Sequence, residues 1–219
     1  MRYIVIDLEM CKVPKCRRTL EYHYSQEIIE IGAVMMDENY QMTDMFDTYV
    51  SPVYGQLDDF IRNLTHITEA NLCHAPSLPQ ALEAFADWCG TTEDVIFYAW
   101  SGTDFAQIER EIFSKKISGS FLPYLNPDLW MDYQQIFGDR FAFDHAVSLE
   151  NAMDLSSLQM EGQVHSGLDD AYNTARMISK LELEPHYELP EYWRNMKKEV
   201  TETLSFSLGE LFAGIQLAV

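Results

Sequence analysis

What this sequence lacks most clearly is positive charge. Among its 219 residues, 15 are lysine or arginine and 35 are aspartate or glutamate, which gives a formal net charge of −20. Proteins that hold duplex nucleic acid usually present a basic surface, because contacts to backbone phosphates dominate their affinity. The charge therefore argues against tight duplex binding. It argues less strongly against a transient contact with a strand end, because bound divalent metals reverse the sign of the local field.

Long apolar runs, export signals and zinc-type cysteine spacings are also missing. No apolar run approaches the roughly 18–20 residues of a membrane helix, and residues 1–10 carry acids too early for a signal peptide. We therefore expect no membrane association and a cytoplasmic location. The four cysteines form one close pair without a second pair or histidines to complete a metal site, which predicts reduced thiols: Cys11, Cys16, Cys73 and Cys89.

The chain is 47% apolar, and its patterns favour strands first and helices later. We expect strands at 2–9, 27–37, 42–50, 95–100 and 129–133, and helices at 57–64, 68–73, 78–89, 104–115, 133–138, 148–154, 167–182 and 191–200. This order favours an α/β fold with a mixed sheet flanked by helices. We place one domain at 1–182 and a helical C-terminal extension at 183–219. The apolar end of the extension either packs on the domain or binds a protein partner.

Two acids end the first expected strand. Asp7 and Glu9 are two residues apart, so on a strand their carboxylates point to the same face. Two adjacent anions at a buried strand end are unfavourable unless a cation lies between them. A divalent metal is the simplest such partner. The same triplet is also compatible with ordinary solvated acids at the end of a strand.

A third acid, Asp104, follows the expected strand at 95–100 and begins the next helix. A carboxylate in a first helical turn can serve simply as a cap. Its position beyond the carboxyl end of a strand also places it where open α/β sheets often form their sites.

The segment from His165 to Asp170 begins the expected helix at 167–182. One helical stripe is wholly polar and is expected to face water: Asp169, Asn173, Arg176 and Lys180. The next stripe is mostly apolar and is expected to face the protein: Asp170, Thr174, Met177 and Leu181. Asp170 therefore needs a buried partner, which a metal would supply. His165 precedes the helix, where its imidazole can reach a metal-bound water or can be an ordinary loop histidine.

These residues together indicate phosphodiester chemistry. Hard oxygen ligands without cysteine suit Mg²⁺ or Mn²⁺, and two such ions about 3.5–4 Å apart commonly serve in-line attack of water on a phosphodiester. The set Asp7, Glu9, Asp104, His165 and Asp170 resembles the DEDDh 3′→5′ exonucleases, which include polymerase proofreading subunits and ribonuclease T. The resemblance covers about residues 1–182.

Within that family, the chain is most similar to the histone-mRNA 3′ exonuclease branch and the bacterial KapD-like proteins. The stretches IDLEMCK, YSQEIIEIGAV, YVSPVYGQLDDFIRNLTHIT and VHSGLDDAYNTARM carry this similarity. It implies a ribonuclease H-like fold with a five-stranded mixed sheet. It also implies hydrolysis of single-stranded RNA or DNA from the 3′ end to nucleoside 5′-monophosphates, with two Mg²⁺ or Mn²⁺ ions per site and RNA favoured.

The resemblance also implies roles for particular residues. Asp7, Glu9 and Asp170 would bind the metal pair, with Asp7 bridging, Asp104 would hold the second ion, and His165 would act as general base. The terminal base would contact residues around the first strand and the helix at 57–64, namely Leu8, Met10, Leu64 and Thr65. Where this branch places a base-stacking aromatic, immediately before the third acid, the chain has Thr103. Trp100 is the candidate substitute. A helix end packed on the core is the competing interpretation of Leu64 and Thr65.

Two further features leave alternatives open. Lys12, Lys15, Arg17 and Arg18 follow the first strand closely, and they either guide substrate phosphates or form a solvated loop that balances nearby acids. The net charge and the apolar C-terminal end are compatible with a regulatory, sporulation-inhibitor-like binding protein or with a polymerase-associated proofreading subunit. The complete set of clustered acids favours an enzyme, because a scaffold has no need of such mutual repulsion.

Overall fold

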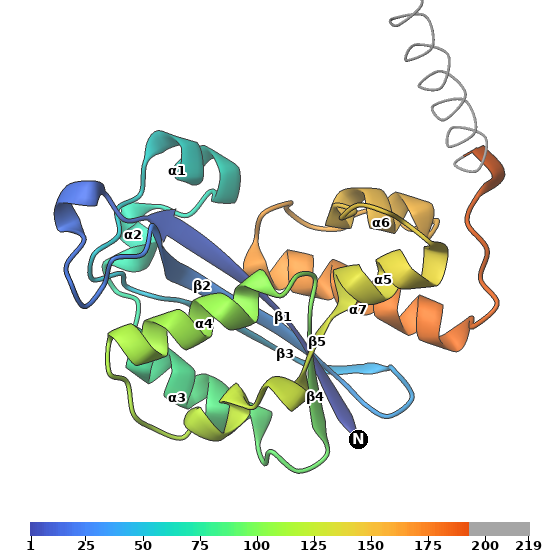
Figure 1. Ribbon diagram of the computed structural model, residues 1–219, viewed down its shortest axis with the longest axis horizontal. Helices are drawn as coiled ribbons and strands as arrows, with labels where there is room; N and C mark the ends of the chain where they lie inside the picture. Colours follow the sequence, from blue (N-terminus) through green and yellow to red (C-terminus); the bar gives the residue numbers. More distant parts are fainter. Residues whose placement is uncertain (193–219) are drawn as a thin grey trace, which may run out of the picture.

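The computed structural model describes residues 1–192, in which five strands form one mixed sheet. The strands are β1 (Arg2–Lys12), β2 (Gln26–Met36), β3 (Met42–Tyr49), β4 (Val95–Ala99) and β5 (Trp130–Asp132). Their order across the sheet is β3-β2-β1-β4-β5. β1, β2 and β3 pair antiparallel, and β4 and β5 continue parallel to β1 (Figure 1). β1 is thus the central strand, with a hairpin on one side and crossover strands on the other.

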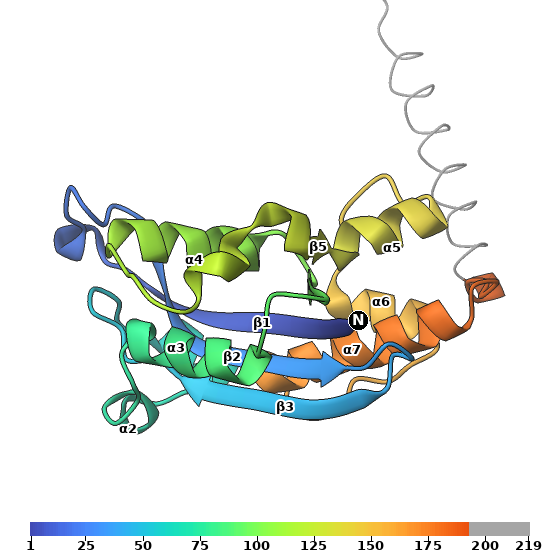
Figure 2. The same cartoon turned by 90° about the horizontal axis from the view of Figure 1, so that it is seen from below.

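Helices cover both faces of the sheet, and the alternation along β1 divides its side chains between two cores. Ile4, Ile6 and Leu8 pack with α3 (Leu78–Cys89) and α4 (Thr103–Ser114). Val5 packs in the second core with α5 (Tyr133–Phe141), α6 (Leu149–Leu155) and α7 (Gly167–Leu183). Because successive side chains of a strand point to opposite faces, an apolar β1 can contribute to both layers (Figure 2).

Two short helices lie at the far end of β1. α1 (Asp59–Thr65) and α2 (Glu69–Leu72) lie near that end in Figure 1. A third apolar cluster holds them there: Cys11, Ile29, Ile61, Ile67 and Leu72. The remaining elements are short 3-10 turns at Lys15–Arg17, Leu122–Leu125 and Pro127–Leu129. α1 and α2 therefore form a wall beside the carboxyl end of the central strand.

The expected α/β fold with a mixed five-stranded sheet is confirmed, with helix and strand ends within a few residues. β1 is longer than expected, because Cys11 and Lys12 still pair with Glu27 and Gln26 of β2. The expected helix at 191–200 lies almost entirely outside the described residues, as does most of the extension at 183–219. Within the described part of the chain, no helix is both long and apolar enough to cross a membrane.

Candidate active site

β4 ends before β1 does, and this leaves one side of β1 unpaired beside the acidic residues. β4 accompanies β1 only as far as the pair Ile6 and Ala99. The chain then turns into α4, whose first turn carries Asp104, only 5% exposed. The Leu8 backbone N–H donates a hydrogen bond to the Asp104 carboxylate. Asp104 therefore stands beside β1 at the level of Asp7 and Glu9, where the missing strand leaves space.

The first turn of α7 brings the last acid to the same place. Glu9 and Asp170 are both buried, and His165 is exposed at their edge. One potential ligand atom from each of Glu9, His165 and Asp170 lies within 4.8 Å of the others. Asp7 experiences the charges of Asp104, Asp170, Glu9 and Glu30. The structure thus brings together all five residues for which the sequence predicted a catalytic role.

Burial and mutual repulsion make this site a strong acceptor of positive charge. Burial, followed by the charge of Asp104, raises the pKa of Asp7 well above its usual range. Burial, followed by the charge of Glu30, raises the pKa of Glu9 to about 8, and burial raises the pKa of Asp104 to about 7. Burial also raises the pKa of Asp170. Such a cluster is stable only when protonated or when a cation replaces the protons.

Close backbone packing fixes the start of α7 against the sheet. The Gly167 N–H donates to Glu30 Oε2 of β2 at 3.1 Å. A Cβ added at Gly32 of β2 would lie 2.1 Å from the Gly167 carbonyl carbon and the Leu168 nitrogen. Only a glycine at position 32 permits this approach. Local sequence patterns do not reveal Gly32 as a contact residue, whereas a glutamate inside the apolar run EIIEIGAV is an unusual feature that marks Glu30.

The loop before α7 is held by its own acids. His165 has φ 63, and its backbone N–H donates to Asp170 Oδ2 at 3.0 Å. Asp169 Oδ2 accepts from the Gln163 N–H at 2.7 Å. The Gln163 side chain in turn donates to the Thr65 carbonyl at 2.9 Å. The loop that presents His165 is therefore attached both to the first turn of α7 and to the end of α1.

The expected orientation of Asp170 is confirmed, whereas that of the neighbouring stripe is wrong at one position. Asn173 was expected to face water but is fully buried. Its amide accepts from the Glu161 N–H at 3.0 Å and donates to the Glu161 carbonyl at 2.8 Å. The loop at 156–166 folds over this side of α7. A polar side chain satisfied by that loop is buried at no loss of hydrogen bonds.

The candidate substrate contacts divide into two groups. Leu8 is buried, Met10 and Leu64 are half-buried, and Thr65 is buried with its hydroxyl donating to the Ile61 carbonyl at 2.9 Å. Trp100 does not fit its expected role. It is 8% exposed, its indole N–H donates to the Val147 carbonyl at 3.2 Å, and it belongs to the second core. A tryptophan at the end of an apolar strand is better interpreted as a core residue.

An exposed aromatic does occur nearby, on α1. Phe60 is 62% exposed. The Lys12 ammonium lies 5.0 Å from the centre of its ring. Phe60 lies on the same short helix as Leu64 and Thr65. In the sequence, one phenylalanine in a helical pattern resembles a core residue, so its exposure is not predictable.

Comparison with known proteins agrees with this geometry. The family model described as "Exonuclease" matches residues 4–178. The chain is 25% identical over 188 residues to human "3'-5' exoribonuclease 1", an alignment that covers 81% of this chain and 51% of that protein. It is 28% identical over 201 residues to human "ERI1 exoribonuclease 2", covering 81% and 28%. The chain thus spans about half the length, or less, of these curated relatives.

Solved structures show the same fold. The nuclease domain of 3'hExo, described as a DEDDh family member bound to rAMP, superimposes with a TM-score of 0.69 at 23% identity, covering 86% of this chain and 94% of that chain. E. coli exonuclease I in complex with a dT13 oligonucleotide gives a TM-score of 0.63 at 14% identity, covering 84% and 42%. The ribonuclease H-like arrangement of the sheet is therefore shared. Since the matching model covers most of the chain, the protein belongs to the exonuclease family.

Proposed function

We propose that this protein is a metal-dependent 3′→5′ exonuclease that hydrolyses single-stranded nucleic acid, RNA in preference to DNA, and releases nucleoside 5′-monophosphates. The observation that carries the proposal is the group of four buried or half-buried carboxylates beside an exposed histidine, in a chain of the exonuclease family. The preference for RNA follows from the two curated relatives that are named exoribonucleases.

The residues present fit a pair of Mg²⁺ or Mn²⁺ ions. All four carboxylates offer hard oxygen donors, and Asp170 Oδ1 is buried without a hydrogen-bond partner in the described structure. A buried oxygen left unpaired is costly, and a cation would satisfy it. Asp7, Glu9 and Asp170 would hold the pair, with Asp104 at the second ion. When bound, the ions supply positive charge at the reacting phosphate and lower the pKa of the attacking water.

The chain itself supplies the proton acceptor and the geometry. His165 is exposed toward solvent, so its imidazole can take a proton from the attacking water as general base. Its backbone is fixed by the hydrogen bond to Asp170 Oδ2. One acid therefore holds the backbone of the histidine and also belongs to the metal-binding group, which keeps His165 beside the carboxylates.

A time course with matched 5′-labelled single-stranded RNA and DNA, in the presence of Mn²⁺, tests the proposal. A ladder that shortens from the 3′ end, and that is absent for Asp7→Ala, would support the exonuclease and reveal its sugar preference. Activity that survives EDTA would contradict metal dependence. No cleavage of either strand would favour the regulatory binding protein.

A second candidate is a proofreading subunit that serves a polymerase. One observation favours it: the chain is 35% identical over 97 residues to "DNA polymerase III PolC-type" of Staphylococcus haemolyticus, covering 44% of this chain and 6% of that protein. A proofreading subunit must bind its polymerase and prefer DNA. Co-purification of a polymerase with the tagged chain, together with faster cleavage of DNA than RNA, would favour this candidate.

A further inference from the structure

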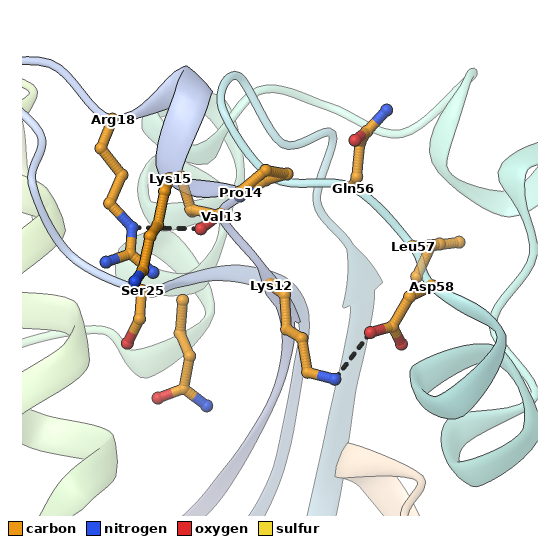
Figure 3. A pocket seen from close by; sticks show the side chains of 10 residues that line it. Lys12, Val13, Pro14, Lys15, Arg18, Ser25, Gln56, Leu57 and Asp58 are labelled. Carbon is orange, nitrogen blue, oxygen red and sulfur yellow. Dashed lines mark hydrogen bonds and ion pairs between the residues drawn. The ribbon is translucent and has the colours of Figure 1, made fainter.

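A basic pocket lies beyond the acids, at the end of the same strand. Its volume is about 610 Å³, and its charged lining consists of Lys12, Lys15, Arg18 and the acid Asp58 (Figure 3). Three cations to one acid is the reverse of the whole chain, which has 15 cations and 35 acids. The pocket is therefore a local positive region in a strongly negative protein.

Two of the three cations, Lys15 and Arg18, are not neutralised by an acid in the described part of the chain. Lys12 pairs with Asp58 at 2.6 Å, so these two charges neutralise each other. Arg18 donates through Nε to the Val13 carbonyl at 3.1 Å, which aims its guanidinium without neutralising it. Lys15 is exposed, and within residues 1–192 neither it nor Arg18 forms an ion pair with an acid. The pocket thus presents an ammonium and a guanidinium whose natural partner is an anion.

Hydrogen bonds tie together the backbone in and beside the pocket. The fully buried Glu27 accepts the N–H groups of Val53, Tyr54 and Gly55, at 2.8, 2.7 and 2.5 Å. Lys115 pairs both with Glu27, at 2.5 Å, and with Glu111, at 2.6 Å, so one ammonium partly offsets two buried carboxylates. On the other rim, the Gln56 N–H donates to the Lys12 carbonyl and the Val13 N–H to the Ser25 carbonyl. The cations are therefore presented on a fixed frame, which reduces the entropy lost on binding.

Two elements connect this pocket to the carboxylates. Along β1, Lys12 is three residues beyond Glu9, or about 10 Å at the usual rise of a strand. Along α1, Asp58 caps the helix at the pocket, and Thr65 at its other end accepts a hydrogen bond from Gln163 of the His165 loop. A helix of this length also spans about 10 Å. A separation of this size corresponds to a few nucleotides, since each nucleotide advances about 3.4 Å in a duplex and further in an extended single strand.

We propose that this pocket is a second binding site for the substrate, which holds backbone phosphates of the single strand a few nucleotides upstream of the bond being cut. The inference rests on the proposed exonuclease function. It explains how a chain with a net charge of −20 can hold a polyanion: the catalytic acids act with bound metals, and the strand is held where the surface is locally basic. Of the two interpretations of the segment at 12–18, a phosphate site and a solvated loop, the proposal corresponds to the first.

Direct binding tests the pocket without depending on turnover. The experiment uses full-length Asp170→Asn protein and measures fluorescence anisotropy of a 5′-fluorescein ten-nucleotide RNA, with and without Lys15→Gln and Arg18→Gln. We expect the double change to raise Kd roughly tenfold and to reduce the slope of log Kd against log salt by about 1.4, because each of the two lost phosphate contacts contributes about 0.7 on a single strand. Lys180→Gln, at the far end of α7, is the control for one lost charge and should leave Kd unchanged.

A length comparison locates the contact. With otherwise unaltered protein and Mn²⁺, the pocket changes should lower kcat/KM on the ten-nucleotide RNA and leave a dinucleotide and the p-nitrophenyl ester of a nucleoside 5′-monophosphate unaffected. Equal losses on all three substrates, or an unchanged Kd for the long strand, would overturn the inference. If the unaltered protein cleaves none of them, the proposed function fails, while the anisotropy still decides the pocket. Lys15→Gln alone, at an exposed side chain, keeps the test valid if the double variant does not fold.

Discussion

Glu9 and Glu30 stand directly opposite each other in the antiparallel ladder between β1 and β2, and both side chains are buried. Like charges in such a pair destabilise a sheet. Burial raises the pKa of Glu30 to about 7 and that of Glu9 to about 8, and Glu30 also shares a side-chain hydrogen bond with Asp47. The electrostatic repulsion between these two glutamates therefore lies at the site where metal binding is proposed.

This pair makes the stability of the metal-free protein depend on pH. The carboxyl group of Glu9 titrates at an ordinary 4.5 when unfolded and at about 8 when folded, so the folded state binds more protons between these values. The resulting stabilisation is complete below about pH 4.5 and is lost as the pH rises through about 8. In EDTA, we expect Tm to fall across this interval. Mn²⁺ should raise Tm more at pH 8 than at pH 5.5, because the ligands must be deprotonated to bind.

Differential scanning calorimetry at several pH values, with and without Mn²⁺, measures both effects. Glu9→Gln is the informative control, because it removes one titrating group while the side chain keeps nearly the same size. In EDTA at pH 8 it should raise Tm by several degrees, given about 1.4 kcal/mol per unit of pKa shift, and it should weaken the response to Mn²⁺. A Tm of the unaltered protein that is flat across this range would contradict the prediction.

Asp170 and Asp169 are adjacent in sequence but differ in environment. Asp170 is buried with one oxygen unpaired, whereas Asp169 is half-buried and accepts the Gln163 N–H. Asp170→Asn should lower kcat/KM on single-stranded RNA by more than roughly 100-fold and weaken Mn²⁺ binding in calorimetric titration. Asp169→Asn keeps an acceptor oxygen for Gln163 and should cost only a few-fold. Similar losses for the two variants would refute the distinction.

His165 is expected to act on the proton rather than on the metal. Its positive φ is tolerated by asparagine, so His165→Asn removes the imidazole with little backbone strain. We expect kcat to fall by roughly 10²–10⁴-fold and Mn²⁺ affinity, measured by calorimetric titration, to stay within a few-fold. Parallel losses of kcat and Mn²⁺ affinity would instead make His165 a ligand, which its distance from Glu9 and Asp170 permits.

Local patterns predicted the elements and the acids, because each depends on a few neighbouring residues. Asp7 and Glu9 share a strand face by the period of two, and Asp170 faces inward by the helical period. Tertiary contacts were not predictable in this way. The burial of Asn173 depends on a loop a dozen residues away folding over α7. The core position of Trp100 depends on α5 and on Val147.

The basic segment illustrates the same division. The sequence showed four cations at and just beyond the end of β1, but it could not separate a phosphate site from a solvated loop. That distinction depends on which cation already has an acidic partner. Lys12 has one only because Asp58, at the start of α1, is brought beside it. Similarly, Glu30 drew no attention in the sequence because its partner, the N–H of Gly167, is 137 residues away.

The close approach of Gly32 to Gly167 gives the sharpest structural prediction. In Gly32→Ala, the new methyl group would lie 2.1 Å from backbone atoms of Gly167 and Leu168, so the start of α7 must move away from β2. We expect a loss of roughly 1–3 kcal/mol of stability from overpacking. Because Asp170 and His165 move with that turn, kcat/KM on single-stranded RNA should fall by roughly 100-fold even well below Tm.

Gly138→Ala provides the matched control. Gly138 lies inside α5, and a Cβ there would meet nothing within 4 Å. Alanine should stabilise that helix by roughly 0.5–1 kcal/mol and raise Tm by a few degrees, with kcat/KM unchanged. Measuring thermal unfolding and kinetics of both variants separates the effect of displacing α7 from the effect of a change in overall stability. A Gly32→Ala protein that keeps full activity would show that the packing of α7 against β2 does not set the distance between Asp170 and the acids of β1.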